Sequence, residues 1–201
     1  MAEANVTFFK RGWRVIALVA LIALSGVWVW WSYFDTYHFA TVQDGILYRD
    51  GVRSHRELAT AYRRAHFKTI VSLVSDEEQT RPEFQDEAAM ARYRGVELIR
   101  IPVKHGGEPT RDDIDRFLAI TRDKSRWPIL VHCAQGVQRT GMMVAAYQIQ
   151  VLGYDKQKAM DSILEFGKGP ERAQAVRAFI DRWYTPPTLL PTAQAPTTAT
   201  E

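Results

Sequence analysis

The single cysteine of this chain stands six residues before an arginine, in the segment VHCAQGVQRTG at 131–141. A cysteine thiolate is a strong nucleophile, and the fork of a guanidinium group can hold two oxygens of a phosphate at once. Cys133 and Arg139 could therefore carry out nucleophilic attack on a phosphate ester. The alternative is an inert core thiol next to an arginine that pairs with a carboxylate.

The residues around Cys133 predict a strand, a short loop and a helix. Residues 129–132 are apolar and typical of a strand, and a helix is predicted from about 140 to 152. Loop amides and the first N–H groups of that helix would surround one point, which favours an anion. The same field lowers the pKa of a thiol, and Gly136 permits the tight turn.

Strands and helices alternate through most of the chain. Strands are predicted at 45–49, 68–74, 96–101 and 129–132, and helices at 54–66, 81–94, from Thr110 onward, 140–152, 155–166 and 170–184. This alternation predicts an α/β fold with a central, mostly parallel sheet flanked by helices. We assign the domain to 39–184 and expect 185–201, rich in proline and threonine, to be a disordered tail.

An apolar segment precedes the domain. Residues 15–34 carry no charge and are long enough to cross about 30 Å of hydrocarbon as a helix. Three basic residues lie in the short segment 1–14, and no Lys or Arg follows until Arg49. The positive-inside rule then predicts a single-pass membrane protein with a cytoplasmic N-terminus and the domain on the far side, in contact with the lipid bilayer through 15–34. A cleaved signal peptide and a buried core helix are the alternatives.

The composition argues against several other classes of protein. A net charge of +3 without a dense basic run gives no reason to expect a nucleic-acid partner. One cysteine cannot form an intrachain disulfide or a cysteine-based zinc site, and the five histidines lack the spacing of metal ligands. No metal and no other cofactor is expected.

The segment HCAQGVQRT at 132–140 matches the signature of the protein tyrosine and dual-specificity phosphatases, His-Cys, five residues, then Arg-Ser/Thr. The domain resembles their compact atypical dual-specificity branch, through LYR at 47–49, KTIVSLV at 68–74 and IP at 101–102. The low-molecular-weight phosphatases carry their cysteine near the N-terminus. Rhodaneses share the strand-Cys-loop-Arg layout but fit this loop less well.

This resemblance implies a phosphoric monoester hydrolase, a protein tyrosine or dual-specificity phosphatase in which Cys133 forms a thiophosphate intermediate. Arg139 and the loop amides would hold the phosphate, Thr140 would hydrogen-bond to the leaving sulfur, and His132 would orient the loop from behind. The phosphate-binding residues would be Ala134, Gln135, Gly136, Val137, Gln138 and Arg139. For Thr140 the alternative is an ordinary helix N-cap.

The aspartate that usually serves the family as general acid is missing here. The loop at 102–109, where the family places it, contains no aspartate, although a general acid accelerates such reactions by about 10²–10⁴-fold. Glu108 and His105 in this loop are the candidates, and either could instead be a solvated loop residue. The acidic run 76–78 lies at the same end of the sheet and supplies further candidates, whereas 112–113 suit the start of the next helix.

The loop interior AQGVQ has no lysine, unlike relatives that act on highly phosphorylated inositols or phosphoinositides. We therefore expect a singly phosphorylated protein or another small phosphomonoester as substrate. The missing aspartate leaves a second function open, a membrane-tethered pseudophosphatase module that binds phosphate with little turnover. A third possibility is a scaffold in which the domain does no chemistry, and such a protein would tolerate a change at Arg139.

Overall fold

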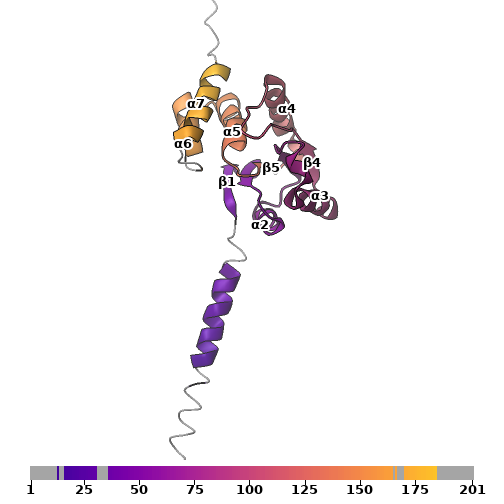
Figure 1. Cartoon of the computed structure of the whole chain (residues 1–201), viewed down its shortest axis with the longest axis vertical. Helices are drawn as coiled ribbons and strands as arrows, with labels where there is room; N and C mark the ends of the chain where they lie inside the picture. The colour runs from indigo at the N-terminus through magenta and orange to yellow at the C-terminus, as the bar shows by residue number, and fades with distance from the viewer. Residues whose placement is uncertain (1–12, 14–15, 31–35, 165, 167–169, 185–201) are drawn as a thin grey trace, which may run out of the picture.

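The computed structural model describes residues 13, 16–30, 36–164, 166 and 170–184. From 37 onward they form a five-stranded sheet with helices on both faces (Figure 1). The predicted tail at 185–201 and nearly all of the basic segment 1–14 lie outside the described residues.

The sheet is mixed but mostly parallel, which confirms the predicted fold class. Its strands are β1 (Tyr37–Gln43), β2 (Leu47–Gly51), β3 (Thr69–Ser72), β4 (Glu97–Arg100) and β5 (Ile129–Cys133). They lie in the order β1-β2-β5-β3-β4, with β1 antiparallel to β2 and all other neighbours parallel. The edge strand β1 was not predicted, because its side chains are almost all half-buried and its seven residues contain no apolar run like those of β3 and β5.

Each predicted helix is present. The helices of the domain are α2 (His55–Ala65), α3 (Pro82–Arg94), α4 (Arg111–Arg122), α5 (Gln138–Gln150), α6 (Lys156–Leu164) and α7 (Pro170–Trp183), with 3-10 turns η1 (Glu78–Thr80) and η2 (Lys124–Arg126). The start of α2 is set by Ser54, whose hydroxyl accepts from the Glu57 N–H, as predicted. Thr110 and Asp113 form a reciprocal capping box at the start of α4, which explains the acidic pair there.

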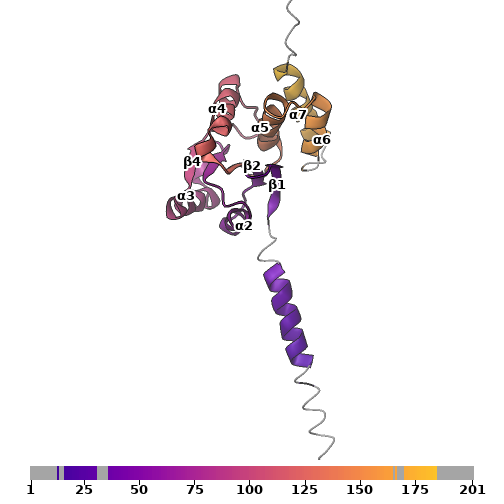
Figure 2. The same cartoon turned by 180° about the vertical axis from the view of Figure 1, so that it is seen from behind.

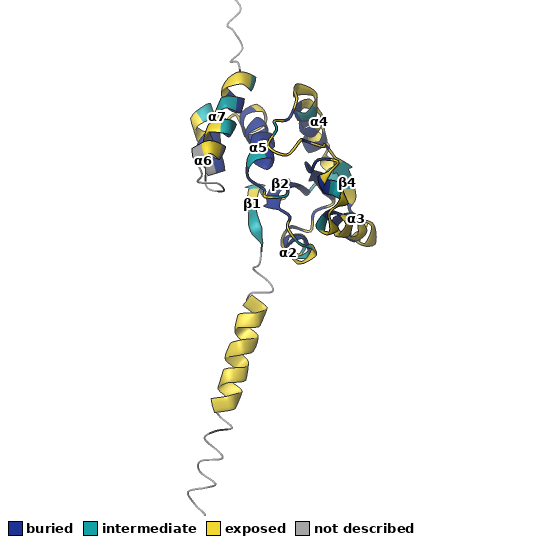
Figure 3. Cartoon of the chain, viewed as in Figure 1, coloured by how far each residue is buried: buried dark blue, intermediate teal, exposed yellow. Residues whose placement is uncertain are grey.

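Two hydrophobic clusters lie on opposite faces of the sheet. Alternate strand residues divide between them: Ile129 and Val131 join the cluster under α4, α5, α6 and α7, whereas Ile70 and Leu130 join the one under α2 and α3. Figures 1 and 2 show the two groups of helices, and Figure 3 shows the buried residues gathered between them. Because β2, β5 and β3 are parallel, their carboxyl ends meet at one edge of the sheet, where a site is expected.

A separate helix over 16–30 precedes the domain (Figure 1). All of its residues are exposed, including Trp28 at 69% and Trp30 at 63% (Figure 3). Within the described ranges, no helix combines the length and the apolar character needed to cross a membrane. The predicted membrane-spanning helix at 15–34 is therefore not confirmed, and its residues 15 and 31–34 lie outside the described residues.

Candidate active site

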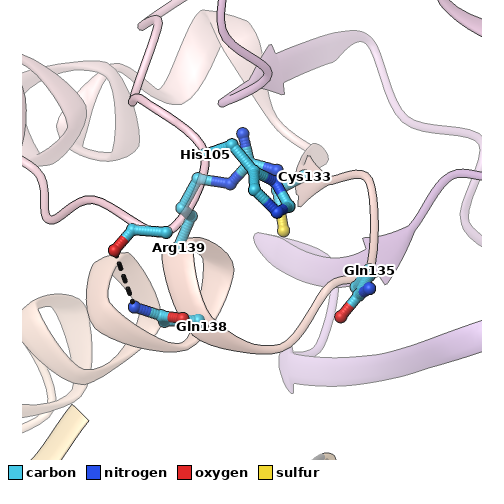
Figure 4. A pocket seen from close by; sticks show the side chains of 6 residues that line it. His105, Cys133, Gln135, Gln138 and Arg139 are labelled. Carbon is cyan, nitrogen blue, oxygen red and sulfur yellow. Dashed lines mark hydrogen bonds between the residues drawn. The ribbon is translucent and has the colours of Figure 1, made fainter. Parts of the chain in front are cut away.

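The predicted nucleophile and the predicted arginine face one pocket. Cys133 ends β5, and Arg139 lies in the first turn of α5, so the loop between them joins the middle of the sheet to a buried helix. The pocket measures about 110 Å³ and is lined by His105, Gly106, Cys133, Gln135, Gln138 and Arg139 (Figure 4). This pocket thus brings together the cysteine, the arginine and one of the two loop residues proposed as general acid.

Cys133 is surrounded by groups that favour its thiolate form. The thiol is 2% exposed, and the Gly136 N–H donates to its sulfur at 3.2 Å. Burial alone would raise the pKa of Cys133, but the charge of Arg139, the Thr140 hydroxyl and amide, and the Gly136 N–H outweigh it, so the pKa lies below its ordinary value. The buried Thr140 hydroxyl has no hydrogen-bond partner of ordinary geometry among the described residues, so it is available to the sulfur.

The loop from Cys133 to Arg139, the predicted phosphate loop, packs against the end of β2 so closely that it requires glycine. Gly136 has a φ of +66°, and a Cβ at this position would lie 2.4 Å from the Asp50 carbonyl oxygen. On the other side of the contact, a Cβ on Gly51 would lie 2.6 Å from the backbone of Gln135. Neither backbone can move aside, so these two glycines allow the loop to reach its position.

Arg139 is held from behind by a buried carboxylate. Its Nη2 donates to Glu78 Oε1 at 3.0 Å, and its Nη1 donates to Glu78 Oε2 and to the carbonyl oxygen of Val103. Burial alone would raise the pKa of Glu78, but its bonds with Arg139 and with the Ser75 N–H lower that pKa to about 2. Glu78 is therefore ionised and unsuited to donate a proton, which removes it from the candidate acids.

The two candidate acids of the 102–109 loop have different surroundings. His105 lines the pocket, and its Nδ1 lies 3.3 Å from Glu78 Oε1. The loop is also tied to α5, because Gln138 Nε2 donates to the Gly106 carbonyl oxygen at 3.5 Å (Figure 4). Glu108 instead forms an exposed ion pair with Arg182 of α7 and does not line the pocket. Geometry thus favours His105.

His132 lies behind the loop, where the family resemblance had placed it. Its ring is fully buried, its Nδ1 lies 3.4 Å from the Cys133 carbonyl oxygen, and its Nε2 contacts Glu87 of α3. The Ser72 hydroxyl donates to the other Glu87 oxygen at 3.2 Å. Burial would lower the pKa of His132, but the Glu87 carboxylate outweighs it and the pKa is raised. The pair fixes the histidine ring behind Cys133.

Sequence reasoning missed three residues that contact this loop or its partners. Arg49 donates to the Gly136 carbonyl oxygen, His38 bonds to the Gln135 carbonyl oxygen, and Glu87 pairs with His132. Arg49 lies in the LYR segment that carried the family resemblance, which was the available signal. Within the described ranges, no three His, Cys, Asp or Glu side chains are grouped so that they could hold a metal ion.

Comparison with known proteins identifies relatives of the domain. Residues 41–178 match the family described as "DSP-PTPase phosphatase fused to NAD+ Kinase". The dual specificity protein phosphatase TpbA of Pseudomonas aeruginosa (strain UCBPP-PA14) is 30% identical over 129 residues, which cover 62% of this chain and 53% of that protein. The chain therefore matches only about half the length of this curated relative.

Solved structures share the fold. The Siw14 catalytic core, a protein of S. cerevisiae, aligns with a TM-score of 0.61 at 19% identity, over 73% of this chain and 84% of that one. The crystal structure of P. aeruginosa TpbA aligns with a TM-score of 0.53 at 24% identity, over 68% and 79%. These likenesses confirm the predicted α/β fold of the tyrosine phosphatase type.

Proposed function

Since the chain belongs to the phosphatase family described as DSP-PTPase phosphatase fused to NAD+ kinase, we propose that it hydrolyses phosphoric monoesters through Cys133. Membership and the relatives confirm the predicted class, a cysteine-dependent phosphatase of the dual-specificity type. The observation that carries the proposal is the convergence of Cys133, Arg139 and His105 on one pocket. The catalytic roles, the substrate and the location of the chain are our proposals.

The reaction takes two steps. In the first, the Cys133 sulfur attacks phosphorus, the S–P bond forms, and the bond to the ester oxygen breaks as that oxygen takes a proton from His105. In the second, water attacks the thiophosphate, gives its proton to His105, and the S–P bond breaks to release phosphate. The Thr140 hydroxyl stabilises the departing thiolate, because its interaction with the sulfur favours the charged form.

Arg139 and the loop amides hold the phosphoryl group through both steps. Glu78 fixes the guanidinium before substrate arrives, so little reorganisation is needed when charge develops on the phosphoryl oxygens. The remaining donors are the amides of residues 134–139, of which the Gly136 N–H already points at the sulfur. Preorganised donors of this kind are the largest electrostatic contribution to many enzymes.

We assign the general acid to His105. Contact of its Nδ1 with Glu78 orients the ring and leaves Nε2 to face the leaving oxygen. Glu108 is already paired with Arg182 and lies outside the pocket lining. A histidine can replace aspartate in this role because a protonated imidazole, like a carboxylic acid, can donate a proton to a leaving oxygen.

We propose a singly phosphorylated protein as the substrate, or another small phosphomonoester. The relative TpbA is named a dual specificity protein phosphatase, whereas S. cerevisiae SIW14 is named a PP-IP phosphatase. The loop interior here has no lysine to meet additional phosphates, which supports a singly phosphorylated substrate. Comparing kcat/KM for phosphotyrosine and phosphothreonine peptides with that for an inositol polyphosphate separates the two classes.

We further propose that the apolar segment 15–34 anchors the chain in a bilayer as a single pass, with the domain on the side opposite the N-terminus. Support comes from its uncharged length, from the basic residues before it, and from the exposure of the apolar side chains over 16–30. Extraction of membranes at alkaline pH tests the anchor. A reporter fused after Tyr184 that is active only in the cytoplasm would contradict the orientation.

Hydrolysis of an aryl phosphate by the full chain tests the proposed function, with Cys133→Ser as the comparison. We expect turnover by the wild type and none by the serine variant, while both bind vanadate. Equal inactivity of the two proteins with retained vanadate binding would instead support the pseudophosphatase. If Arg139→Ala kept both hydrolysis and vanadate binding, that result would contradict both the phosphatase and the pseudophosphatase.

A further inference from the structure

The carbonyl groups on the outer side of the phosphate loop are held by the segment that begins the domain. The Gly136 N–H points inward to the Cys133 sulfur, and a loop that turns amides inward must turn carbonyls outward. Arg49 Nη2 donates to the Gly136 carbonyl oxygen at 2.6 Å, and His38 Nδ1 lies 2.8 Å from the Gln135 carbonyl oxygen. Both donors come from the β1–β2 hairpin.

The histidine must be the donor in its contact with the loop. A carbonyl oxygen only accepts hydrogen bonds, so Nδ1 of His38 carries a hydrogen. Directly after β2, the Val52 N–H donates to the Cys133 carbonyl oxygen at 3.1 Å, which continues the pairing of β2 with β5 up to the start of the loop. The hairpin therefore satisfies two carbonyls of this loop, those of Gln135 and Gly136.

The backbone at His38 is in an unfavourable conformation that serves this contact. Its φ is +66°, and among the described residues His66 is the other non-glycine residue with a positive φ. Such a conformation is disfavoured for a residue with a Cβ and persists where surrounding contacts compensate. The His38 ring packs on Tyr37 at 4.0 Å between centroids, and the register of β1 on β2 is irregular between Tyr37 and Ala40, the stretch that contains His38.

We infer that His38 is a positioning residue for the phosphate loop. Its bond to the Gln135 carbonyl, beside that of Arg49 to the Gly136 carbonyl, holds the loop amides toward the phosphate. His38 does not line the pocket and acts only through Gln135. The inference rests on the proposed function, because that function assigns phosphate binding to the loop.

Three variants of the full chain test this role. His38→Gly accepts the positive φ but removes the donor, whereas His38→Asn tolerates that φ and retains an N–H donor. His66→Gly is the matched control, because His66 has a φ of 44° at the end of α2 and does not line the pocket. The measurements are vanadate affinity, thermal stability and the pH dependence of thiol alkylation, which reports on Cys133 alone because the chain has one cysteine.

We expect His38→Gly to weaken vanadate binding by about 3- to 10-fold, as for loss of one hydrogen bond, and to raise the pKa of Cys133. Its thermal stability should equal that of the wild type or exceed it. His38→Asn should bind vanadate within about twofold of the wild type, and His66→Gly should match the wild type in affinity and alkylation.

Wild-type affinity and alkylation in His38→Gly would overturn the inference. Equal losses of vanadate affinity in His38→Gly and His66→Gly would also overturn it, because the effect would then not be specific to His38. A wild type that binds no vanadate and whose thiol has an ordinary pKa would refute the proposed function, and this inference with it. None of these measurements requires turnover, so the two failures are distinguishable.

Discussion

Glu78 and Arg139 form a buried ion pair with two points of contact, although 61 residues separate them in the chain. Their side chains are 3% and 5% exposed. The pair links the segment after β3 to the first turn of α5 and fixes the orientation of the guanidinium. His105 contacts the same carboxylate, so Glu78 joins the phosphate-holding group to the proposed acid.

Replacing Glu78 with glutamine should destabilise the domain by about 3 kcal/mol, because the buried charge of Arg139 loses its partner. The pKa of Glu78 is lowered to about 2 from an ordinary 4.5, so the pair stabilises the fold fully above pH 4.5. That advantage of the wild type should shrink as the pH falls toward 2. Urea unfolding at several pH values measures it, with the exposed Glu77→Gln as a control that should lose far less stability. A Glu78→Gln variant as stable as this control at pH 7 would contradict the pair's role.

Replacing His105 with asparagine should slow the reaction according to the leaving group. For phenyl phosphate, kcat should fall by about 100-fold, whereas 4-nitrophenyl phosphate, with a better leaving group, should be much less affected. Glu108→Gln is the matched change in the same loop and should leave both substrates nearly unaffected. Equal losses for both substrates would show that His105 positions the loop and is not the acid.

Replacing Thr140 with alanine should raise the pKa of Cys133 and slow the second step. The hydroxyl favours the thiolate, and its removal makes the sulfur a poorer leaving group. Stopped-flow assays should show a burst of the first product followed by slow turnover. Thr140→Ser keeps the hydroxyl and should behave like the wild type. A Thr140→Ala variant without a burst and with an unchanged alkylation profile would argue that Thr140, which lies in the first turn of α5 and is not its N-cap, does not act on the sulfur.

Replacing Gly136 with alanine should abolish vanadate binding, because the added Cβ would meet the Asp50 carbonyl oxygen at 2.4 Å. Gly153→Ala separates this clash from backbone strain, since Gly153 has a similar φ of +68° with open space around it. The control should lose about 1–2 kcal/mol of stability and keep its vanadate affinity. Calorimetric titration with vanadate measures both variants. Equal affinity in the two alanine variants would contradict the close packing of the loop on β2.

The elements of this fold and the position of the proposed nucleophile could be predicted because each depends on a local pattern. Apolar runs mark β3 and β5, Ser54 and Thr110 mark the starts of helices, and the cysteine and arginine stand on one short loop. Strand β1 has no such pattern, and its pairing to β2 depends on tertiary contacts instead.

The side chains that pair with the site residues could not be predicted, because residues of similar chemistry that are neighbours in the sequence differ only in how far they are buried. Glu78 belongs to an acidic run with Asp76 and Glu77, and only the turn η1 decides that Glu78 faces inward. In the same way, Glu108 and His105 are equivalent candidates in the sequence. Pairing of Glu108 with Arg182, 74 residues away, separates them.

The central claim is that Cys133 forms a covalent bond to phosphorus, and trapping that bond tests it most directly. The full chain would be mixed rapidly with 4-nitrophenyl phosphate, quenched with denaturant and examined by mass spectrometry, with Thr140→Ala used to slow breakdown. We predict a peptide containing Cys133 that has gained the mass of one phosphoryl group, and none in Cys133→Ser. Steady hydrolysis by the wild type without any such adduct, or equal hydrolysis by Cys133→Ser, would contradict the account.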